Sequence, residues 1–276
     1  MKFQYFTYFL NSLEQQTLFP DTRDKNELLR NLLERDEIEY ETNGAQLAFV
    51  SVRNKDNYFV GRLGRKASIK RSSPPDEKFA ERREEDWPNC SIVINTNPEE
   101  GLGQKIAFEL NTKVFRNPLE QLQRFSQELN SHLFTSGYAI SINPITEERK
   151  FWEIVQNNED KIEKLIFTFN SPNLFGIDNS LNEDLDKLHE VYLSTKVSLE
   201  LENPDGKLLV PENELTKQAV EYITQGGGQF SMKIKGKHQK ISSKDNIKSK
   251  VVDDIEIDVE NATPETLREI FDRIFR

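Results

Sequence analysis

The chain has 276 residues, of which 37 are Lys or Arg and 47 are Asp or Glu, so its formal net charge at pH 7 is −10. Apolar residues make up a lean 36% and charged residues 30%, which indicates a globular protein with a well-hydrated surface. A single cysteine, Cys90, excludes internal disulfides and multi-cysteine zinc sites and fits a reducing cytoplasm. No run approaches the roughly 18 apolar residues that span a bilayer. We therefore expect a soluble, cytoplasmic protein.

The first predicted element is a strand over residues 2–10 that is apolar on both faces, which indicates a central position in a sheet. Asp24 and Glu27 form a capping box in front of a helix with a leucine stripe. Three strands then follow as a meander, and Asn43-Gly44 makes the tight turn between the first two.

The second half of the chain alternates further strands with helices. Asn117, Pro118 and Glu120 predict a helix start, because they supply an N-cap, a first-turn proline and an acid three residues on. Gly137 predicts the end of that helix. Further strands are predicted at residues 138–142, 165–169 and 197–201, and a last helix after residue 263. Meander strands with separate helices predict an α+β fold, an antiparallel sheet with packed helices, rather than a doubly wound sheet.

A first basic cluster follows the third strand of the meander and contains no acid. Its members are Arg62, Arg65, Lys66, Lys70 and Arg71. Gly61 and Gly64 flank it and would let a backbone approach closely, and the arginine forks suit fixed phosphate contacts. In the alternative interpretation the cluster is a solvated strand end, balanced by the acid-rich residues 76–86.

A second basic cluster lies in residues 226–250 and runs against the acidic background of the chain. It comprises Lys233, Lys235, Lys237, Lys240, Lys244, Lys248 and Lys250, against a single acid, Asp245. Phe230, Met232 and Ile234 alternate with polar residues, which predicts a half-buried strand with lysines on its exposed face. Residues 251–259 alternate apolar and acidic residues and predict the partner strand, so we expect a hairpin with a long basic tip.

Two interpretations of the second cluster remain open. In the first, Lys233 and Lys235 pair with acids of the next strand, and the other lysines form a solvated loop. In the second, the lysines from Lys237 to Lys250 form a flexible arm that meets a polyanion, most simply a nucleic-acid backbone. The preceding glycines 226–228 are not a phosphate-binding loop, because no Gly-Lys-Ser/Thr follows them; they predict a helix end and a hinge.

The sequence predicts no catalytic, metal or cofactor site. The three histidines have no histidine partner at helical spacing and no nearby cysteine, and no G-x-S-x-G motif is present. The best fragments of a PD-(D/E)xK nuclease site are Asp205 and Glu159 with Lys161, which so charged a chain supplies by chance. Cys90 lacks a histidine partner and predicts a buried thiol. We expect no cofactor, no small-molecule substrate and no metal-dependent cleavage of nucleic acid.

From about residue 90 onward the order of elements resembles that of the RexA-like phage-exclusion proteins, a group related to the KwaB subunit of the Kiwa antiphage system. The segments that carry the resemblance are SIVINT, GQKIAFELNTKVFRNPLEQLQRF, GYAISINPI, KLIFTF, KVSLELENPDG and FSMKIKG. Near the N-terminus, YFTYFLNSL and VRNKDNYFVGRLGRKAS fit the same plan. The acidic residues 76–86 have no obvious counterpart in it.

The resemblance implies a cytoplasmic homodimer that binds double-stranded DNA with little sequence preference in a basic cleft, as a sensor for a membrane-protein effector of abortive infection. It also implies a main α+β domain of residues 1–97 and 161–276, with a smaller swivel-like α+β domain inserted at residues 98–160. The two basic clusters would then hold the DNA. The alternatives are a non-catalytic interaction or toxin-neutralising protein with a working acidic surface, and a divergent metal-dependent nuclease.

Overall fold

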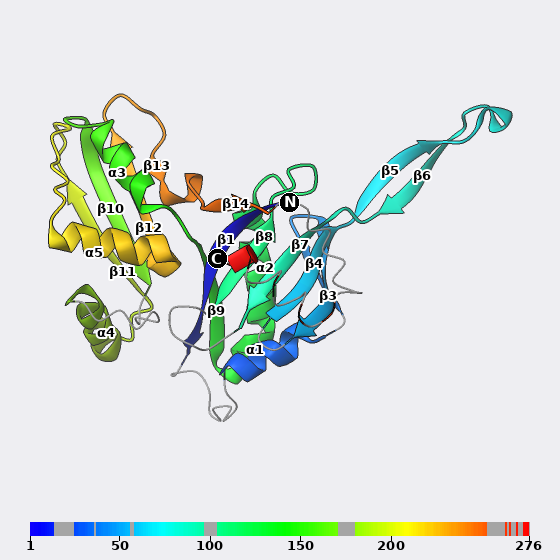
Figure 1. Ribbon diagram of the computed structural model, residues 1–276, viewed down its shortest axis with the longest axis horizontal. Helices are drawn as coiled ribbons and strands as arrows, with labels where there is room; N and C mark the ends of the chain where they lie inside the picture. The colour runs from blue at the N-terminus through cyan, green and yellow to red at the C-terminus, as the bar shows by residue number, and fades with distance from the viewer. Residues whose placement is uncertain are drawn as a thin grey trace.

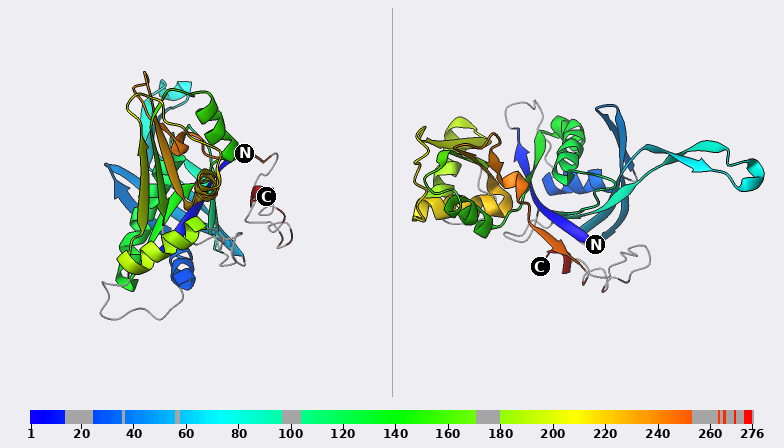
Figure 2. Two further views of the ribbon diagram at one scale, coloured as in Figure 1. Left: turned by 90° about the vertical axis from the view of Figure 1, so that its left-hand side faces the viewer. Right: turned by 90° about the horizontal axis from the view of Figure 1, so that it is seen from above.

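The computed structural model of the chain describes residues 1–13, 25–35, 37–55, 58–96, 104–170 and 180–252, with residues 263, 265, 269 and 273–275. It confirms the α+β fold. A large antiparallel sheet lies at the centre, a smaller sheet with its helices at one end, and a two-stranded ribbon projects from the other end (Figure 1). Figure 2 shows the molecule along its long axis, from the end that carries the small sheet, and its elongated shape from above.

The large sheet has eight strands in the order β14-β1-β8-β7-β4-β3-β2, with β9 also paired to β1. The strands are β1 (Lys2–Ser12), β2 (Glu37–Thr42), β3 (Ala45–Lys55), β4 (Tyr58–Arg65), β7 (Asn89–Asn95), β8 (Lys105–Glu109), β9 (Tyr138–Pro144) and β14 (Ser249–Val251). The predicted central position of β1 is confirmed, because it pairs with β8, β9 and β14. Asn43 and Gly44 make the predicted turn between β2 and β3, both with positive φ.

Helices α1 (Lys25–Leu33) and α2 (Pro118–Leu133) cover one face of this sheet and close its main core. The Asn117 side chain accepts a hydrogen bond from the backbone N–H of Glu120 (3.3 Å), so the predicted N-cap of α2 is confirmed. After a short 3₁₀ turn, η2 (Phe134–Ser136), Gly137 ends the helical segment with φ +78°. Phe125 of α2 stacks on Phe49 of β3, with 5.0 Å between ring centroids. Asp24 of the predicted α1 capping box lies outside the described residues.

The other face of the large sheet carries a second, smaller apolar cluster. Phe3 and Tyr5 of β1, with Val93 of β7, pack there against Val252 and Ile274. The Tyr5 hydroxyl donates to the backbone carbonyl of Ile274 (2.5 Å). Chain from beyond β14 therefore covers this face, although most of the helix predicted after residue 263 lies outside the described residues.

The small sheet has four antiparallel strands in the order β11-β10-β12-β13. They are β10 (Ile162–Asn170), β11 (Lys196–Glu202), β12 (Gly228–Ile234) and β13 (Ile241–Ser242). Helices α3 (Glu148–Gln156), α4 (Ser180–Tyr192) and α5 (Glu214–Tyr222) contribute apolar residues to a core on one face of it. The other face shows no packed helix in the described part of the chain, and β11 ends the sheet on one side (Figure 1).

The large sheet and the small sheet meet at the glycine run that follows α5. The segment η3 (Ile223–Gly227) continues α5 and ends it, as predicted. Thr7 of β1 donates its hydroxyl to the carbonyl of Gln225 (2.8 Å), and a Cβ on Gly226 would lie 2.5 Å from the Thr7 hydroxyl oxygen. Glycine is needed here because the Thr7 side chain leaves no room for a Cβ and because Gly226 has φ +92°.

The sheets divide the chain at other points than those we expected. Within residues 98–160, β8, α2 and β9 belong to the large sheet and its core, and only α3 joins the small sheet. β8 and β9 belong to the large sheet rather than to the expected inserted domain, because they pair with opposite edges of the apolar β1. The smaller α+β unit runs instead from α3 to β13, and the chain then returns to the large sheet as β14.

The projecting ribbon consists of β5 (Ala67–Ser72) and β6 (Glu81–Asp86), which pair only with each other. A 3₁₀ turn, η1 (Pro75–Glu77), lies at its tip. Lys78 and Phe79 follow with positive φ, and Phe79 is exposed. Every residue of the two strands is exposed or half-buried, so the ribbon contributes nothing to the cores.

Candidate nucleic-acid interface

The first basic cluster is divided between β4 and the charged ribbon, by which we mean residues 66–87. Lys66, Lys70 and Arg71 each meet a glutamate of β6. The pairs are Lys66–Glu85 at 2.8 Å, Lys70–Glu81 at 2.9 Å and Arg71–Glu84 at 3.1 Å. The charged ribbon holds six basic and six acidic residues, so its formal charge is zero. The acid-rich stretch thus balances these three cations, as the solvated alternative predicts.

The two arginines on β4 have a different environment. Arg62 is exposed and donates to the Asn89 side-chain oxygen (3.2 Å), and Arg65 is exposed. Gly61 does not offer a free approach to a ligand backbone, because it is buried beneath the Phe49 ring and a Cβ there would lie 2.9 Å from the carbonyl oxygen of Val50. This glycine serves the packing of β4 on β3.

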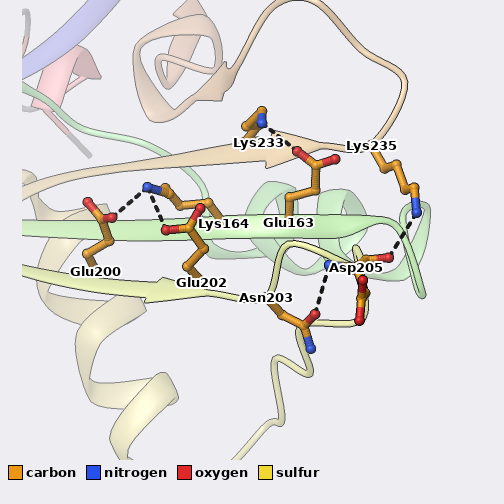
Figure 3. Close-up of polar contacts among 8 residues, drawn as sticks. All are labelled: Glu163, Lys164, Glu200, Glu202, Asn203, Asp205, Lys233 and Lys235. Carbon is orange, nitrogen blue, oxygen red and sulfur yellow. Dashed lines mark hydrogen bonds and ion pairs between the residues drawn. The ribbon is translucent and has the colours of Figure 1, made fainter.

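The lysines of β12 and the turn after it contact the small sheet (Figure 3). Lys233 forms an ion pair with Glu163 of β10 (2.6 Å). Lys235 donates to the backbone carbonyl of Asp205 (3.1 Å). Lys237 donates to the Asn158 side-chain oxygen (3.2 Å). Neutralisation of Lys233 therefore comes from β10, whereas the acids of residues 253–259 lie outside the described residues.

The helix-free face of the small sheet carries a second group of ion pairs beside Lys233. Lys164 of β10 lies 2.6 Å from Glu200 and 3.0 Å from Glu202, both on β11 (Figure 3). Hydrogen bonds that Lys164 donates to these carboxylates, first to Glu200 and then to Glu202, raise the pKa of Lys164. The charges on this face thus neutralise one another across neighbouring strands.

The lysine segment, by which we mean residues 237–250, follows a different path from the predicted hairpin. It leaves the small sheet through β13, makes a 3₁₀ turn, η4 (Ser243–Asp245), and joins β1 as β14. Ser242 and Asp245 form a capping box around that turn. The predicted pairing of residues 251–259 with β12 is wrong for Val251, which pairs with Lys2 of β1; residues 253–259 lie outside the described residues.

None of the five lysines of this segment has a carboxylate partner in the described part of the chain. Lys237 bonds to Asn158, as described above, and Lys240, Lys244 and Lys248 are exposed. Lys250 donates to the backbone carbonyl of Arg273 (3.2 Å), a contact that leaves its charge uncompensated. The one acid of the segment, Asp245, accepts from the backbone N–H of Ser242 (3.0 Å). Among the described residues, the lysine segment therefore keeps its excess positive charge after folding.

The fold adds a cation that the sequence did not single out. Lys105 begins β8, which pairs with β1, the strand that β14 also pairs with. Burial lowers the pKa of Lys105, and the neighbouring charge of Lys248 lowers it further. The sequence signal for this pairing was weak, because it depends on two strands far apart in the chain meeting on β1.

The two basic clusters do not form one compact surface. The charged ribbon projects from one end of the molecule and the small sheet lies at the other (Figure 1). β14 lies between them, beside β1 (Figure 1). Of the predicted DNA-binding residues, the fold thus brings Lys248 and Lys250 to the large sheet, and leaves Lys233 and Lys235 on the small one.

The residues considered for a nuclease site lie in two turns of the smaller unit, Asp205 after β11 and Glu159 and Lys161 after α3. The backbone carbonyl of Asp205 accepts from Lys235, as described above. In the described ranges, no group of three or more His, Cys, Asp or Glu side chains is placed to hold a metal ion. Cys90 is fully buried, as predicted, and burial raises the pKa of its thiol to about 12.

Comparison of the chain with protein-family models, with curated proteins and with solved structures finds no match. Within the described residues, none of the helices combines the length and apolar character that crossing a bilayer requires.

Proposed function

We propose that the chain binds double-stranded DNA, without sequence preference, through the lysine segment and Lys105. The observation that carries this proposal is the charge that remains after folding. In a chain with a net charge of −10, Lys240, Lys244 and Lys248 have no carboxylate partner among the described residues. Burial is the larger cause of the lowered pKa of Lys105, and the second cause, the charge of Lys248, indicates that Lys105 lies close to the lysine segment.

Lysines that are not neutralised within the fold suit phosphate recognition. An ammonium on a flexible stem acts as a compact charge, and contacts to phosphates carry no base information. Concentrated positive charge on an acidic protein also steers a polyanion to one place, away from the rest of the surface. Lys66, Lys70 and Arg71 are left out of the proposed contact surface because each already meets a glutamate.

The biological setting in this proposal comes from the resemblance to the RexA-like phage-exclusion proteins. It would make the chain a cytoplasmic, homodimeric DNA sensor of a bacterial antiphage system, acting through a membrane-protein effector. The resemblance concerns the order of elements, so the DNA contact is the part that the charges on the surface support.

Fluorescence anisotropy with labelled duplexes tests the DNA contact directly. If roughly five phosphates are neutralised, log K should fall against log[salt] with a slope of about −4 to −5. Duplexes of unrelated sequence should bind equally, because the lysines contact phosphates rather than base edges. No binding to any duplex at low salt would overturn the proposal, and a strong preference for one sequence would overturn its mode.

A further inference from the structure

β11 forms one edge of the small sheet. All seven of its residues pair with β10 without a register shift. Its outer edge has no strand partner in the described part of the chain. Proline, bulges and very short length, which stop many edges from pairing, are absent from β11, and its charged residues are Lys196, Glu200 and Glu202.

Exposed apolar side chains lie on β11 and at the end of α4, the helix that precedes it in the chain. Leu199 and Leu201 of β11 are 38% and 37% exposed. Val191 and Tyr192, at the end of α4, are 70% and 72% exposed. Leu199 and Leu201 stand opposite Phe167 and Leu165 of β10, two members of the small-sheet core, so the apolar row lies on the face that the helices cover. A second apolar row could extend this core.

The sequence of β11, KVSLELE, is complementary to itself in one antiparallel register. If Leu199 faces Leu199 of a second copy, Val197 faces Leu201 and the apolar row continues across the junction. In the same register Lys196 faces Glu202, and this opposite-charge pair occurs twice because the two copies are related by a two-fold axis.

We propose that two copies of the chain associate edge to edge through β11, in the register that places Leu199 on the two-fold axis, so that two small sheets form one continuous sheet. Both apolar matching and charge complementarity favour this register. Lys196 supports it further, because it is exposed and forms no ion pair within the described part of its own chain. Glu202 already lies 3.0 Å from Lys164, which holds the carboxylate in place at the strand end.

Charge reversal on β11 tests both the surface and the register. Lys196→Glu would set glutamates against Glu202 at both ends of the junction, and Glu202→Lys would set lysines against Lys196. Each variant alone should dimerise roughly tenfold or more weakly than the wild type, because two attractive cross-strand pairs become repulsive. An equimolar mixture should recover dimers, because a glutamate at position 196 of one variant then faces a lysine at position 202 of the other.

The measurement is analytical ultracentrifugation and light scattering of the full chain without DNA, up to roughly 100 µM, a range that detects weak association. Lys113→Glu is the matched control; Lys113 is exposed on the loop before α2, so its reversal should leave the dimer unchanged. Circular dichroism verifies that each variant is folded. If Glu202→Lys fails to fold, Leu199→Arg replaces it as the weakening variant, and the Lys196→Glu/Glu202→Gln double variant, in which the repulsion between positions 196 and 202 is removed, replaces the mixture as the recovery arm.

A monomeric wild type would overturn the inference. So would a dimer that neither reversal weakens, or variants that weaken it without recovery in the mixture. These outcomes do not depend on DNA binding, since no DNA is present, and loss of DNA binding in the anisotropy experiment would leave them unchanged.

Discussion

The charged ribbon and the lysine segment look alike as runs of basic residues, but the fold treats them in opposite ways. In the charged ribbon, β5 and β6 are neighbours in the chain and in space, so each of Lys66, Lys70 and Arg71 meets a glutamate. In the lysine segment, the chain turns through η4 and joins β1, which brings Lys248 near another lysine, Lys105, and pairs it with no carboxylate in the part of the chain that the structure describes.

The comparison shows that a count of charges along the sequence does not give the charge of a surface. Exposed ion pairs such as those of the charged ribbon contribute only about 0.2–1 kcal/mol each to stability. They nevertheless remove the local positive potential that would attract a polyanion. A run of basic residues therefore attracts a polyanion only where the fold does not place acidic side chains beside it.

The largest expected effect comes from reversing the charges of the two regions separately. Lys240→Glu, Lys244→Glu and Lys248→Glu together should weaken DNA binding roughly 100-fold and make the salt slope less steep by about 3, because three phosphate contacts are lost. The matched triple variant in the charged ribbon, Lys66→Glu, Lys70→Glu and Arg71→Glu, should change affinity less than about threefold. Anisotropy titrations at several salt concentrations measure both.

Equal losses of DNA affinity in the two triple variants would contradict the difference between the two regions, since the ion pairs of the charged ribbon would then not have neutralised its lysines and arginine. No loss of DNA affinity in either variant would show that the lysine segment and the charged ribbon do not contact DNA. Thermal unfolding followed by circular dichroism is the control, because neither set of side chains lies in a core and the midpoint should shift little.

What the sequence predicts well here is local. The Asn117 cap, the Asn43-Gly44 turn and the end at Gly137 of the helical segment formed by α2 and η2 each depend on a few consecutive residues, and each is confirmed. The apolar pattern of β1 also predicts its central position, because both faces must be buried.

What the sequence does not predict is pairing between distant segments. The partner of β14 is β1, at the opposite end of the chain, and nothing in the pattern of residues 251–259 distinguishes this from a hairpin with β12. The pairs Lys233–Glu163 and Lys164–Glu200 likewise join strands that are far apart in sequence. By contrast, the acids that neutralise Lys70 and Arg71 were visible at residues 81 and 84. These acids could be recognised from the sequence because β5 and β6 are consecutive strands of one hairpin, so their residues lie close together in the chain as well as in space.

A smaller effect is expected on stability, from substituting two glycines that lie shortly before the charged ribbon and the lysine segment. Gly61, beside Arg62, is enclosed by Phe49 and the Val50 carbonyl, so Gly61→Ala should lower the free energy of unfolding by about 2 kcal/mol through overpacking. Gly236, just before the lysine segment, has φ +81° and open space around it. Gly236→Ala should cost only about 1 kcal/mol, from backbone strain alone. Urea denaturation measures both.

If Gly61→Ala proves neutral and instead weakens DNA binding, the glycine allows close approach of a ligand backbone and the first basic cluster returns as a contact surface. The stability ranking of the two alanine variants thus tests the placement of Gly61 independently of the charge reversals.

The smallest expected effect is on the pKa of two titrating groups, one beside each region. Lys248→Met keeps an apolar stem and removes a charge near Lys105, so the pKa of Lys105 should rise. It should remain below the ordinary value, because burial is the larger cause of the lowering. Lysine side-chain NMR signals followed through alkaline pH measure the shift.

Lys66→Met is the counterpart in the charged ribbon. The pKa of Glu85 is lowered first by its hydrogen bond from Lys66 and then by that from the Trp87 indole, so this substitution should raise the pKa of Glu85. Removing a cation raises both pKa values, but at opposite ends of the pH scale. At neutral pH Lys66 therefore lies beside a carboxylate that cancels its charge, whereas Lys248 lies beside a second cation. If the pKa of Lys105 is unchanged in Lys248→Met, Lys105 and Lys248 do not interact. Lys105 would then not belong with the lysine segment in the surface proposed to bind DNA.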